Sequence, residues 1–208
     1  LDQLPVAIIH DVYMHCSYAD LPQRHRIKRS ICRLVERKLA HNSLGSLPTT
    51  TPRPAAGKPR MLVVLEWFSG GHSIYRTHSR TLEAARRHFD LHAVGYASNA
   101  DDLGRAVFDE FTELSAPNDL LACVRQVRDL AAELQPQVLY MPSVGMFPLT
   151  LFIANLRLAS LQVAALGHPA TTGSRHIDYI CVEEDFVGDP ACFDEKLLLL
   201  PSDGQPYR

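Results

Sequence analysis

Residues 62–73 of this 208-residue chain read LVVLEWFSGGHS, a run of four apolar residues followed by a loop that contains glycine. Residues 62–65 have the length and composition of a short buried strand, and a helical pattern begins near Ile74. A strand that turns through glycines into a helix forms a polar pocket at its carboxyl edge. His72 stands in this pocket, so the segment predicts both a fold class and a candidate site.

The same alternation of strand and helix continues over residues 61–208. We expect strands at residues 61–65, 91–96, 138–141, 163–166, 179–182 and 197–200, and helices at residues 74–89, 119–134 and 149–159. Strands that are apolar throughout, rather than at every second position, are typical of a parallel sheet covered on both faces. Right-handed crossovers then predict an α/β fold with a Rossmann-like parallel sheet and helices on both faces.

Two helices are predicted before this sheet, at residues 4–18 and 22–40, each with a proline in its first turn. The second has a basic face, which is either a solvated surface or a docking surface for an acidic partner or a neighbouring domain. Its basic residues are Arg24, Arg26, Lys28, Arg29, Arg33, Arg37 and Lys38. We therefore interpret residues 1–40 as the end of an N-terminal helical domain and residues 41–60 as a linker rich in Ser, Thr, Pro and Gly. Residues 61–208 form a Rossmann-like domain, which we call the lobe.

Composition excludes several classes of protein. A net charge of -2 gives no global reason to expect a nucleic-acid partner. The five cysteines are scattered without a close pair, which predicts a reducing cytoplasm rather than a disulfide framework or a zinc site. No apolar run approaches the ~20 residues of a membrane span. Because the chain starts without methionine and ends in a tail that resembles a linker, we expect a fragment of a longer protein.

Well-known nucleotide-binding and metal-binding patterns do not match. The loop before Ile74 lacks the Gly-x-Gly-x-x-Gly pattern, and no Walker-type Gly-Lys-Ser/Thr occurs. His72 and His78 are six positions apart, which is not the spacing that puts two ligands on one helical face, and no Cys, Asp or Glu completes a cluster. We expect no metal and no bound cofactor.

Three loops are predicted to meet at the carboxyl edge of the sheet, at residues 67–73, 142–146 and 167–174. In the first, Ser73 is the predicted helix N-cap, and His72 lies beside the positive end of the helix dipole. That position favours a neutral imidazole, as a general base or hydrogen-bond acceptor requires. The alternative is a loop histidine that caps a local carbonyl.

Two later residues of this helix have a functional and a structural interpretation. Arg76 either binds an anion or pairs with a surface acid. His78 shares one helix face with Ile74 and Leu82, so a core histidine is favoured over one that contacts a ligand.

The third loop and the first helix supply further candidates. Small residues and hydroxyls in residues 167–174 can bind a phosphate or sugar without formal charge, although an exposed turn has a similar composition. Asp11 lies beside His10 among apolar neighbours, and it either pairs on the surface or projects toward the sheet edge.

Three motifs in order resemble a known family. They are HDVYMHCSYA (residues 10–19), VVLE followed by HSIYRTHS (63–66 and 72–79), and LGHPATT (166–172). They resemble the bacterial cytoplasmic protein N-glycosyltransferases that modify high-molecular-weight adhesins, which are relatives of the O-GlcNAc transferases. The resemblance extends over nearly the whole chain.

The resemblance implies a GT-B enzyme, with two Rossmann-like lobes behind a helical domain, that transfers a hexose from a UDP-sugar to asparagine with inversion and without a metal. This chain corresponds to the end of the helical domain and the first, acceptor-side lobe. The second lobe, which supplies most uridine and pyrophosphate contacts, is expected after Arg208, so the chain alone is expected to be inactive.

The resemblance also implies roles for single residues. Asp11 matches an acidic position near the acceptor asparagine and His72 a histidine that faces the cleft, and both are predicted to be catalytic. The predicted substrate-binding residues are Ser73, Arg76, His78, His168, Thr171, Thr172 and Gly173. The partners are a UDP-hexose and an asparagine-containing protein or peptide, with an adhesin as a candidate.

Two other functions stay open at this point. One is an O-linked, GlcNAc-type protein glycosyltransferase, and the other is a non-catalytic interaction module that binds a partner through the basic helix.

Overall fold

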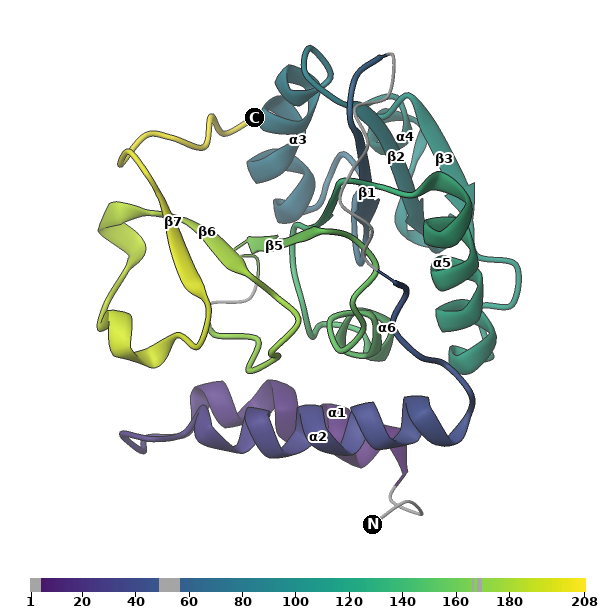
Figure 1. The fold of residues 1–208 in the computed structure, drawn as a ribbon. Helices are drawn as coiled ribbons and strands as arrows, with labels where there is room; N and C mark the ends of the chain where they lie inside the picture. The colour runs from purple at the N-terminus through teal and green to yellow at the C-terminus, as the bar shows by residue number, and fades with distance from the viewer. Residues whose placement is uncertain (1–4, 49–56, 166, 168–169) are drawn as a thin grey trace.

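The computed structural model describes residues 5–48, 57–165, 167 and 170–208. Its centre is one parallel sheet with the strand order β3-β2-β1-β4-β5-β6-β7 (Figure 1). The strands are β1 (Arg60–Val64), β2 (Asp90–Gly95), β3 (Glu110–Glu113), β4 (Val138–Met141), β5 (Leu161–Ala165), β6 (Tyr179–Glu183) and β7 (Lys196–Leu200). The predicted α/β fold with a Rossmann-like parallel sheet is confirmed.

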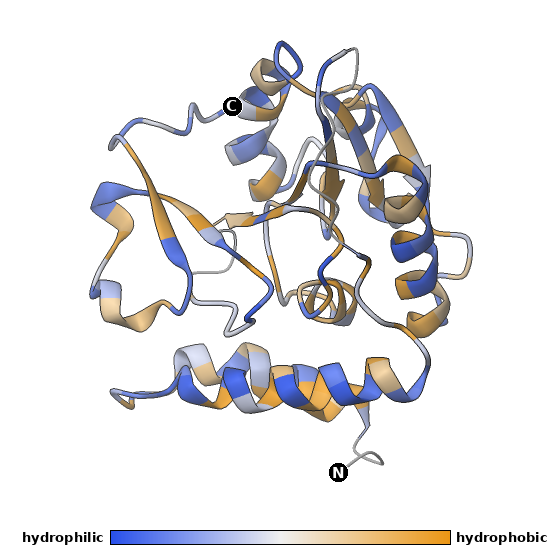
Figure 2. Cartoon of the chain, viewed as in Figure 1, coloured by the Kyte–Doolittle hydropathy of each residue, from blue (hydrophilic) through white to orange (hydrophobic). Residues whose placement is uncertain are grey.

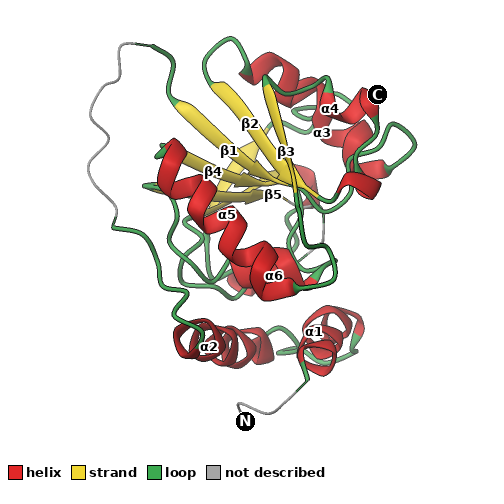
Figure 3. Cartoon of the chain, turned by 90° about the vertical axis from the view of Figure 1, so that its right-hand side faces the viewer, coloured by secondary structure: helices red, strands yellow, loops and turns green. Residues whose placement is uncertain are grey.

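Helices cover both faces of this sheet, with α3 and α4 on one side and α5 and α6 on the other (Figure 3). The α-helices are α1 (Val6–His15), α2 (Arg26–His41), α3 (Ser73–Ala85), α4 (Asp102–Arg105), α5 (Leu120–Leu134) and α6 (Pro148–Ile153). Short 3-10 helices are η1 (Cys16–Tyr18), η2 (Ala97–Asn99), η3 (Glu184–Phe186) and η4 (Pro190–Cys192). Among the helices that the structure describes, none has both the length and the apolar composition needed to cross a bilayer.

The central strands are buried on both sides because successive side chains point to opposite faces. Leu62 and Val64 of β1 join the core under α5 and α6, whereas Val63 and Leu65 join the core under α3. Figure 2 accordingly shows mostly apolar residues in the middle of the sheet and in α6, and alternating polar and apolar residues in α5. This two-sided burial explains why the strands read as continuous apolar runs.

The two N-terminal helices pack against α6 and share its core. Tyr13 of α1 and Val35 and Leu39 of α2 are buried in the same cluster as the residues of α5 and α6. Figure 1 shows α1 and α2 side by side beneath the sheet. The predicted pair of helices is therefore present and fixed to the lobe.

The segment that follows α2 is partly fixed as well. Residues 41–60 were expected to form a linker, and residues 49–56 of it lie outside the described part of the chain. Leu44 is buried in the core, and Ser46 accepts a hydrogen bond at Oγ from the Arg157 N–H at 2.9 Å. The start of this segment thus holds α2 against the lobe.

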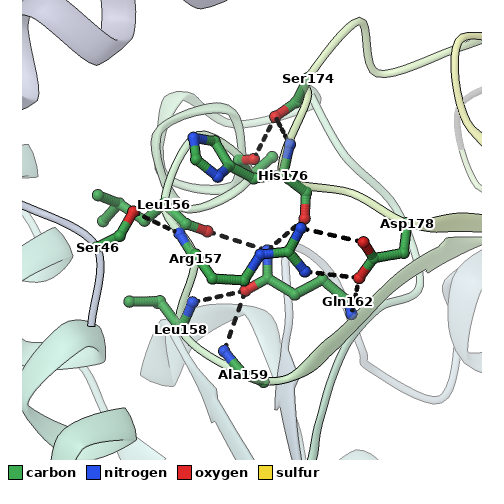
Figure 4. Close-up of polar contacts among 10 residues, drawn as sticks. Ser46, Leu156, Arg157, Leu158, Ala159, Gln162, Ser174, His176 and Asp178 are labelled. Atoms are coloured by element: carbon green, nitrogen blue, oxygen red, sulfur yellow. Dashed lines mark hydrogen bonds and ion pairs between the residues drawn. The ribbon is translucent and has the colours of Figure 1, made fainter. Parts of the chain in front are cut away.

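Helix α6 ends at Ile153, earlier than the predicted helix at residues 149–159. The N–H groups of Leu158 and Ala159 donate to Oε1 of buried Gln162, at 2.7 and 3.2 Å, so they are not available to a continuing helix (Figure 4). The neighbouring Arg157 guanidinium pairs with Asp178 at 2.6 Å. These bonds turn the chain from α6 into β5.

Strand β3 was not predicted. It reads EFTE, lies at one edge of the sheet and has no fully buried residue. An edge strand needs no continuous apolar run, so the signal that revealed the central strands is missing here.

Candidate functional site

The candidate site lies where the strand order reverses, between β1 and β4. In an open α/β sheet, ligands bind outside the carboxyl ends of the strands at such a switch point. The loops after β1 (residues 66–73) and β4 (residues 142–147) meet there, which confirms the predicted convergence for these two of the three loops.

Glu66 joins these two loops from inside the protein. Its carboxylate accepts hydrogen bonds from the hydroxyls of Ser143 and Thr150 and from the N–H groups of Gly145 and Phe147, at 3.0 and 2.9 Å. Burial raises the pKa of Glu66, and these four hydrogen bonds act in the opposite direction. A buried carboxyl with this many donors fixes the geometry of the switch point.

Helix α1 is attached to the same loop. His10 is 2.8 Å from the carbonyl oxygen of Gly145 through Nε2, and the ring of Tyr13 packs on the glycine itself. Gly145 has φ +105°, and a Cβ there would come within 2.5 Å of the Tyr13 ring, so only glycine fits. The N-terminal helices are thereby held against the loop after β4.

His72 is the N-cap of α3, where Ser73 was expected; that prediction was wrong. His72 has extended backbone angles, φ -88° and ψ 146°, and its Nδ1 accepts a hydrogen bond from the Ile74 N–H at 3.2 Å. Ser73 is already the first helical residue. The histidine side chain thus satisfies an N–H group that serine or aspartate usually caps.

The ring of His72 is part of an aromatic group at the sheet edge. It stacks on Trp67 with 5.7 Å between centroids and 19° between planes, and Trp67 in turn contacts Phe147 at 5.5 Å. Partial burial, followed by the charge of Arg76, lowers the pKa of His72. Both effects favour the neutral form of the imidazole, in the direction that the sequence predicted.

The other predicted residues of α3 differ in exposure. Ser73 and Arg76 are exposed, and the Arg76 guanidinium lies 5.4 Å from the ring centroid of Tyr207. His78 is 1% exposed, its Nδ1 is 3.3 Å from the hydroxyl of Tyr140, and burial lowers its pKa to about 4. The structure thus places His78 in the core, in agreement with the favoured interpretation, and its role in substrate binding stays a prediction.

In the loop after β5, the described hydroxyls point inward. Thr171 donates to Glu195 at 2.7 Å, and Thr172 donates to the same carboxylate through both its hydroxyl and its N–H group, the latter at 2.8 Å. The Gly173 N–H donates to Oγ1 of Thr171 at 3.1 Å. These groups stabilise the loop itself, and their contact with a substrate stays a prediction. His168 lies outside the described residues.

Lys28 binds this loop from the side of α2. It is completely buried, donates to the carbonyl oxygen of Thr171 at 3.1 Å and lies 4.3 Å from the centroid of the Tyr13 ring. The Tyr13 hydroxyl donates to the carbonyl oxygen of Thr172 at 2.8 Å. Burial lowers the pKa of Lys28 to about 8. Both N-terminal helices therefore hold the loop after β5.

Asp11 lies on the exposed side of α1. Its side chain is 71% exposed and pairs with His15 at 3.0 Å. Both residues border a largely apolar hollow of about 750 Å³, formed with η1 and the start of α2. Its other lining residues are Val12, Cys16, Ala19, Leu21, Pro22, Gln23, Arg24 and Ile27. The structure therefore shows Asp11 in a surface pair, the first of its two predicted alternatives, and its contact with an acceptor stays a prediction.

Sequence reasoning missed four residues that organise the site: Lys28, Glu66, Trp67 and Glu195. Only Glu66 left a local signal, an acid directly after an apolar strand. Within the described part of the chain, no three His, Cys, Asp or Glu side chains gather as metal ligands.

Comparison with known proteins gives the following relatives. The family described as HMW1 domain 2 matches residues 1–39. Two proteins named UDP-glucose:protein N-beta-glucosyltransferase, from Actinobacillus pleuropneumoniae serotype 5b (strain L20) and serotype 7 (strain AP76), are 43% and 44% identical over the whole of this chain. The chain spans 33% of the length of each.

Among solved structures, a mutant of the Thermobaculum terrenum O-GlcNAc transferase has the same fold. The match covers 94% of this chain and 37% of the transferase chain, with a TM-score of 0.65 and 19% sequence identity. The expected resemblance is confirmed: over its whole length, the chain is similar to about one third of each of these two proteins named UDP-glucose:protein N-beta-glucosyltransferase.

Proposed function

We propose that this chain is the acceptor-side portion of an inverting UDP-hexose:protein asparagine N-glycosyltransferase. The observation that carries the proposal is the 43–44% identity to two N-glucosyltransferases over the whole chain. The match includes both N-terminal helices and every strand of the lobe. A second GT-B lobe, which binds most of the UDP, completes the enzyme.

The chemistry required is the displacement of UDP from the anomeric carbon by an amide nitrogen. That nitrogen is a poor nucleophile, so positioning and proton removal both lower the barrier. A single displacement inverts the anomeric centre through a transition state that resembles an oxocarbenium ion. The exposed carboxylate of Asp11 and the neutral imidazole of His72 are the groups that we propose for orienting the acceptor.

The remaining predicted substrate contacts lie in α3 and in the loop after β5. Ser73 and Arg76 are exposed near His72, where a cation and a helix N-terminus favour an anionic ligand. Thr171, Thr172 and Gly173 form the loop at the same edge, with His168 before them. We propose these residues for binding of the donor.

The partners follow from this function. They are a UDP-hexose and an asparagine-containing protein, and we propose an adhesin as the natural acceptor and the cytoplasm as the compartment. The five cysteines, all within the described residues, are unpaired, which suits a reducing environment. We further propose that transfer needs no metal.

The test uses this chain joined to the second lobe, incubated with UDP-glucose and an Asn-x-Ser/Thr peptide. We expect hexose on asparagine by mass spectrometry, whereas this chain alone binds UDP-glucose weakly and transfers nothing. A sugar on serine or threonine would indicate the O-linked alternative.

Single variants test the two proposed catalytic residues in the same two-lobed protein. His72→Ala and Asp11→Ala are each expected to lower the rate of transfer by at least ~100-fold, in the range of lost acid–base or positioning groups. Unchanged transfer in both variants would remove these residues from the mechanism and favour a non-catalytic module.

A further inference from the structure

The hydrogen bond at Nδ1 of His72 determines where the ring carries its proton. The backbone N–H of Ile74 can only donate, so Nδ1, 3.2 Å away, must present its lone pair. A neutral imidazole has one N–H, and with Nδ1 as acceptor this N–H is at Nε2. The remaining nitrogen of His72 is thus a donor.

The surroundings of His72 keep the ring in this orientation. Trp67 lies nearly parallel to it, at 19° and 5.7 Å between centroids. A flip of the ring would place a C–H group against the Ile74 N–H and leave the N-terminus of α3 without its cap. Partial burial and the charge of Arg76 also disfavour a second proton on the ring.

We infer that His72 acts as a hydrogen-bond donor through Nε2–H toward a substrate oxygen, and that it does not act as the general base. This inference rests on the proposed function and refines the role of one residue in it. Two substrate oxygens can accept this hydrogen bond, a charged oxygen on the diphosphate of the sugar donor and the neutral carbonyl oxygen of the acceptor amide. The positive end of α3 and Arg76 both stabilise negative charge at this position.

The proton of the reaction then needs another acceptor. As the nitrogen–carbon bond forms, the bond from the anomeric carbon to the UDP oxygen breaks, its electron pair leaves with UDP, and the amide nitrogen loses one proton. Nε2 of His72 already carries a hydrogen, and Nδ1 is occupied. The Asp11 carboxylate, exposed and bonded to His15 through one oxygen, takes the proton and becomes a carboxylic acid.

The tautomer is measured directly by ¹⁵N NMR of this chain, with His72→Asn to assign the signals. We expect a protonated nitrogen at Nε2 and an unprotonated nitrogen at Nδ1 near neutral pH. The opposite tautomer would overturn the inference whatever the protein catalyses. Addition of UDP to the two-lobed protein identifies the partner: a shift of the Nε2 signal indicates the diphosphate, and a shift that needs the acceptor peptide indicates the carbonyl.

Activity of three variants in the two-lobed protein provides the second test. Asparagine keeps the cap on Ile74 but lacks the distal donor, glutamine restores a donor near the position of Nε2, and alanine lacks both. We expect His72→Ala and His72→Asn to lose ~10²–10³-fold in kcat, as for one lost donor to developing charge. His72→Gln should recover at least ~10-fold of this loss.

Equal loss in all three variants would contradict donation and support a base. Melting temperatures separate the cap from the chemistry, because His72→Asn should melt like the wild type and His72→Ala earlier. If the wild-type protein transfers no sugar, the proposed function fails, while the NMR result still decides the tautomer.

Discussion

Two loops at the same edge of the sheet have similar compositions and opposite structures. In residues 66–73, after β1, Glu66 and Phe68 are buried, but the half-buried rings of Trp67 and His72 reach the surface, and among the described residues only Nδ1 of His72 is hydrogen-bonded to the protein. Residues 170–174, after β5, are buried, and Thr171 and Thr172 donate their hydroxyls to Glu195. We call the first loop open, because its Trp67 and His72 rings reach solvent, and the second loop closed, because its hydroxyls are hydrogen-bonded inside the protein.

The difference shows that glycine and hydroxyl residues in a loop do not by themselves indicate a ligand site. Every buried N–H group and hydroxyl needs a partner, and the closed loop finds its partners within the protein. Its partners Lys28 and Glu195 come from α2 and from the segment before β7. The open loop is therefore the better candidate for direct contact with a substrate.

The largest effect is expected for Gly173→Ala, which disrupts the closed loop. Gly173 has φ +68°, and an added Cβ would come within 2.8 Å of Cβ of Lys28 and 3.1 Å of the backbone nitrogen of Arg29. The left-handed backbone and the crowding together should lower the free energy of unfolding by about 3 kcal/mol. Urea unfolding of the wild type and the variant measures this difference.

A loss below about 1 kcal/mol for Gly173→Ala would mean that the closed loop moves away from α2 at little cost. The two loops would then differ less than their contacts indicate, and the hydroxyls of Thr171 and Thr172 could turn toward a substrate.

Much of the fold was predictable because burial on both faces leaves a continuous apolar run. Residues 61–65 and 138–141 have this pattern and are the central strands β1 and β4. Strand β3 escaped prediction because an edge strand tolerates Glu110 and Glu113. The handedness of the crossovers then predicted a Rossmann-like sheet, but not the order of its strands.

The site was predictable only in part. The position of His72 followed from the glycines and the helix after them, but its capping bond depends on backbone angles that a sequence does not reveal. The inward orientation of Thr172 depends on Glu195, more than twenty positions later, and no local pattern pairs two such residues. Local signals thus located the site without separating its open loop from its closed one.

A second prediction concerns the buried charge behind the closed loop. Burial lowers the pKa of Lys28 to about 8, below its value in the unfolded chain. As the pH rises above 8, native Lys28 loses its proton while the unfolded chain keeps it, so the cost of burying the charge disappears. Between about pH 8 and pH 10 this contribution should add about 2 kcal/mol to the free energy of unfolding.

The matched variant for this prediction is Lys28→Met, which keeps most of the side-chain volume without the charge. Burial raises the pKa values of Tyr13 and Cys32, which lowers stability at high pH in both proteins. The difference between wild type and variant in urea unfolding therefore isolates Lys28. A difference that is constant with pH would show that Lys28 does not titrate in this range, and would contradict the lowered pKa that its burial predicts.

The smallest effect is expected for Gly71→Ala, a substitution in the open loop. Gly71 has no heavy atom within 4 Å of an added Cβ and no left-handed backbone, so the free energy of unfolding should change by no more than about 0.5 kcal/mol. Its neighbour is the matched control, because a Cβ on Gly70 would meet Cδ1 of Leu103 at 2.9 Å. Gly70→Ala should therefore cost more, about 1 kcal/mol. If Gly71→Ala instead destabilises the protein as much as Gly173→Ala, the loop after β1 is packed in solution, and the contrast between an open and a closed loop does not hold.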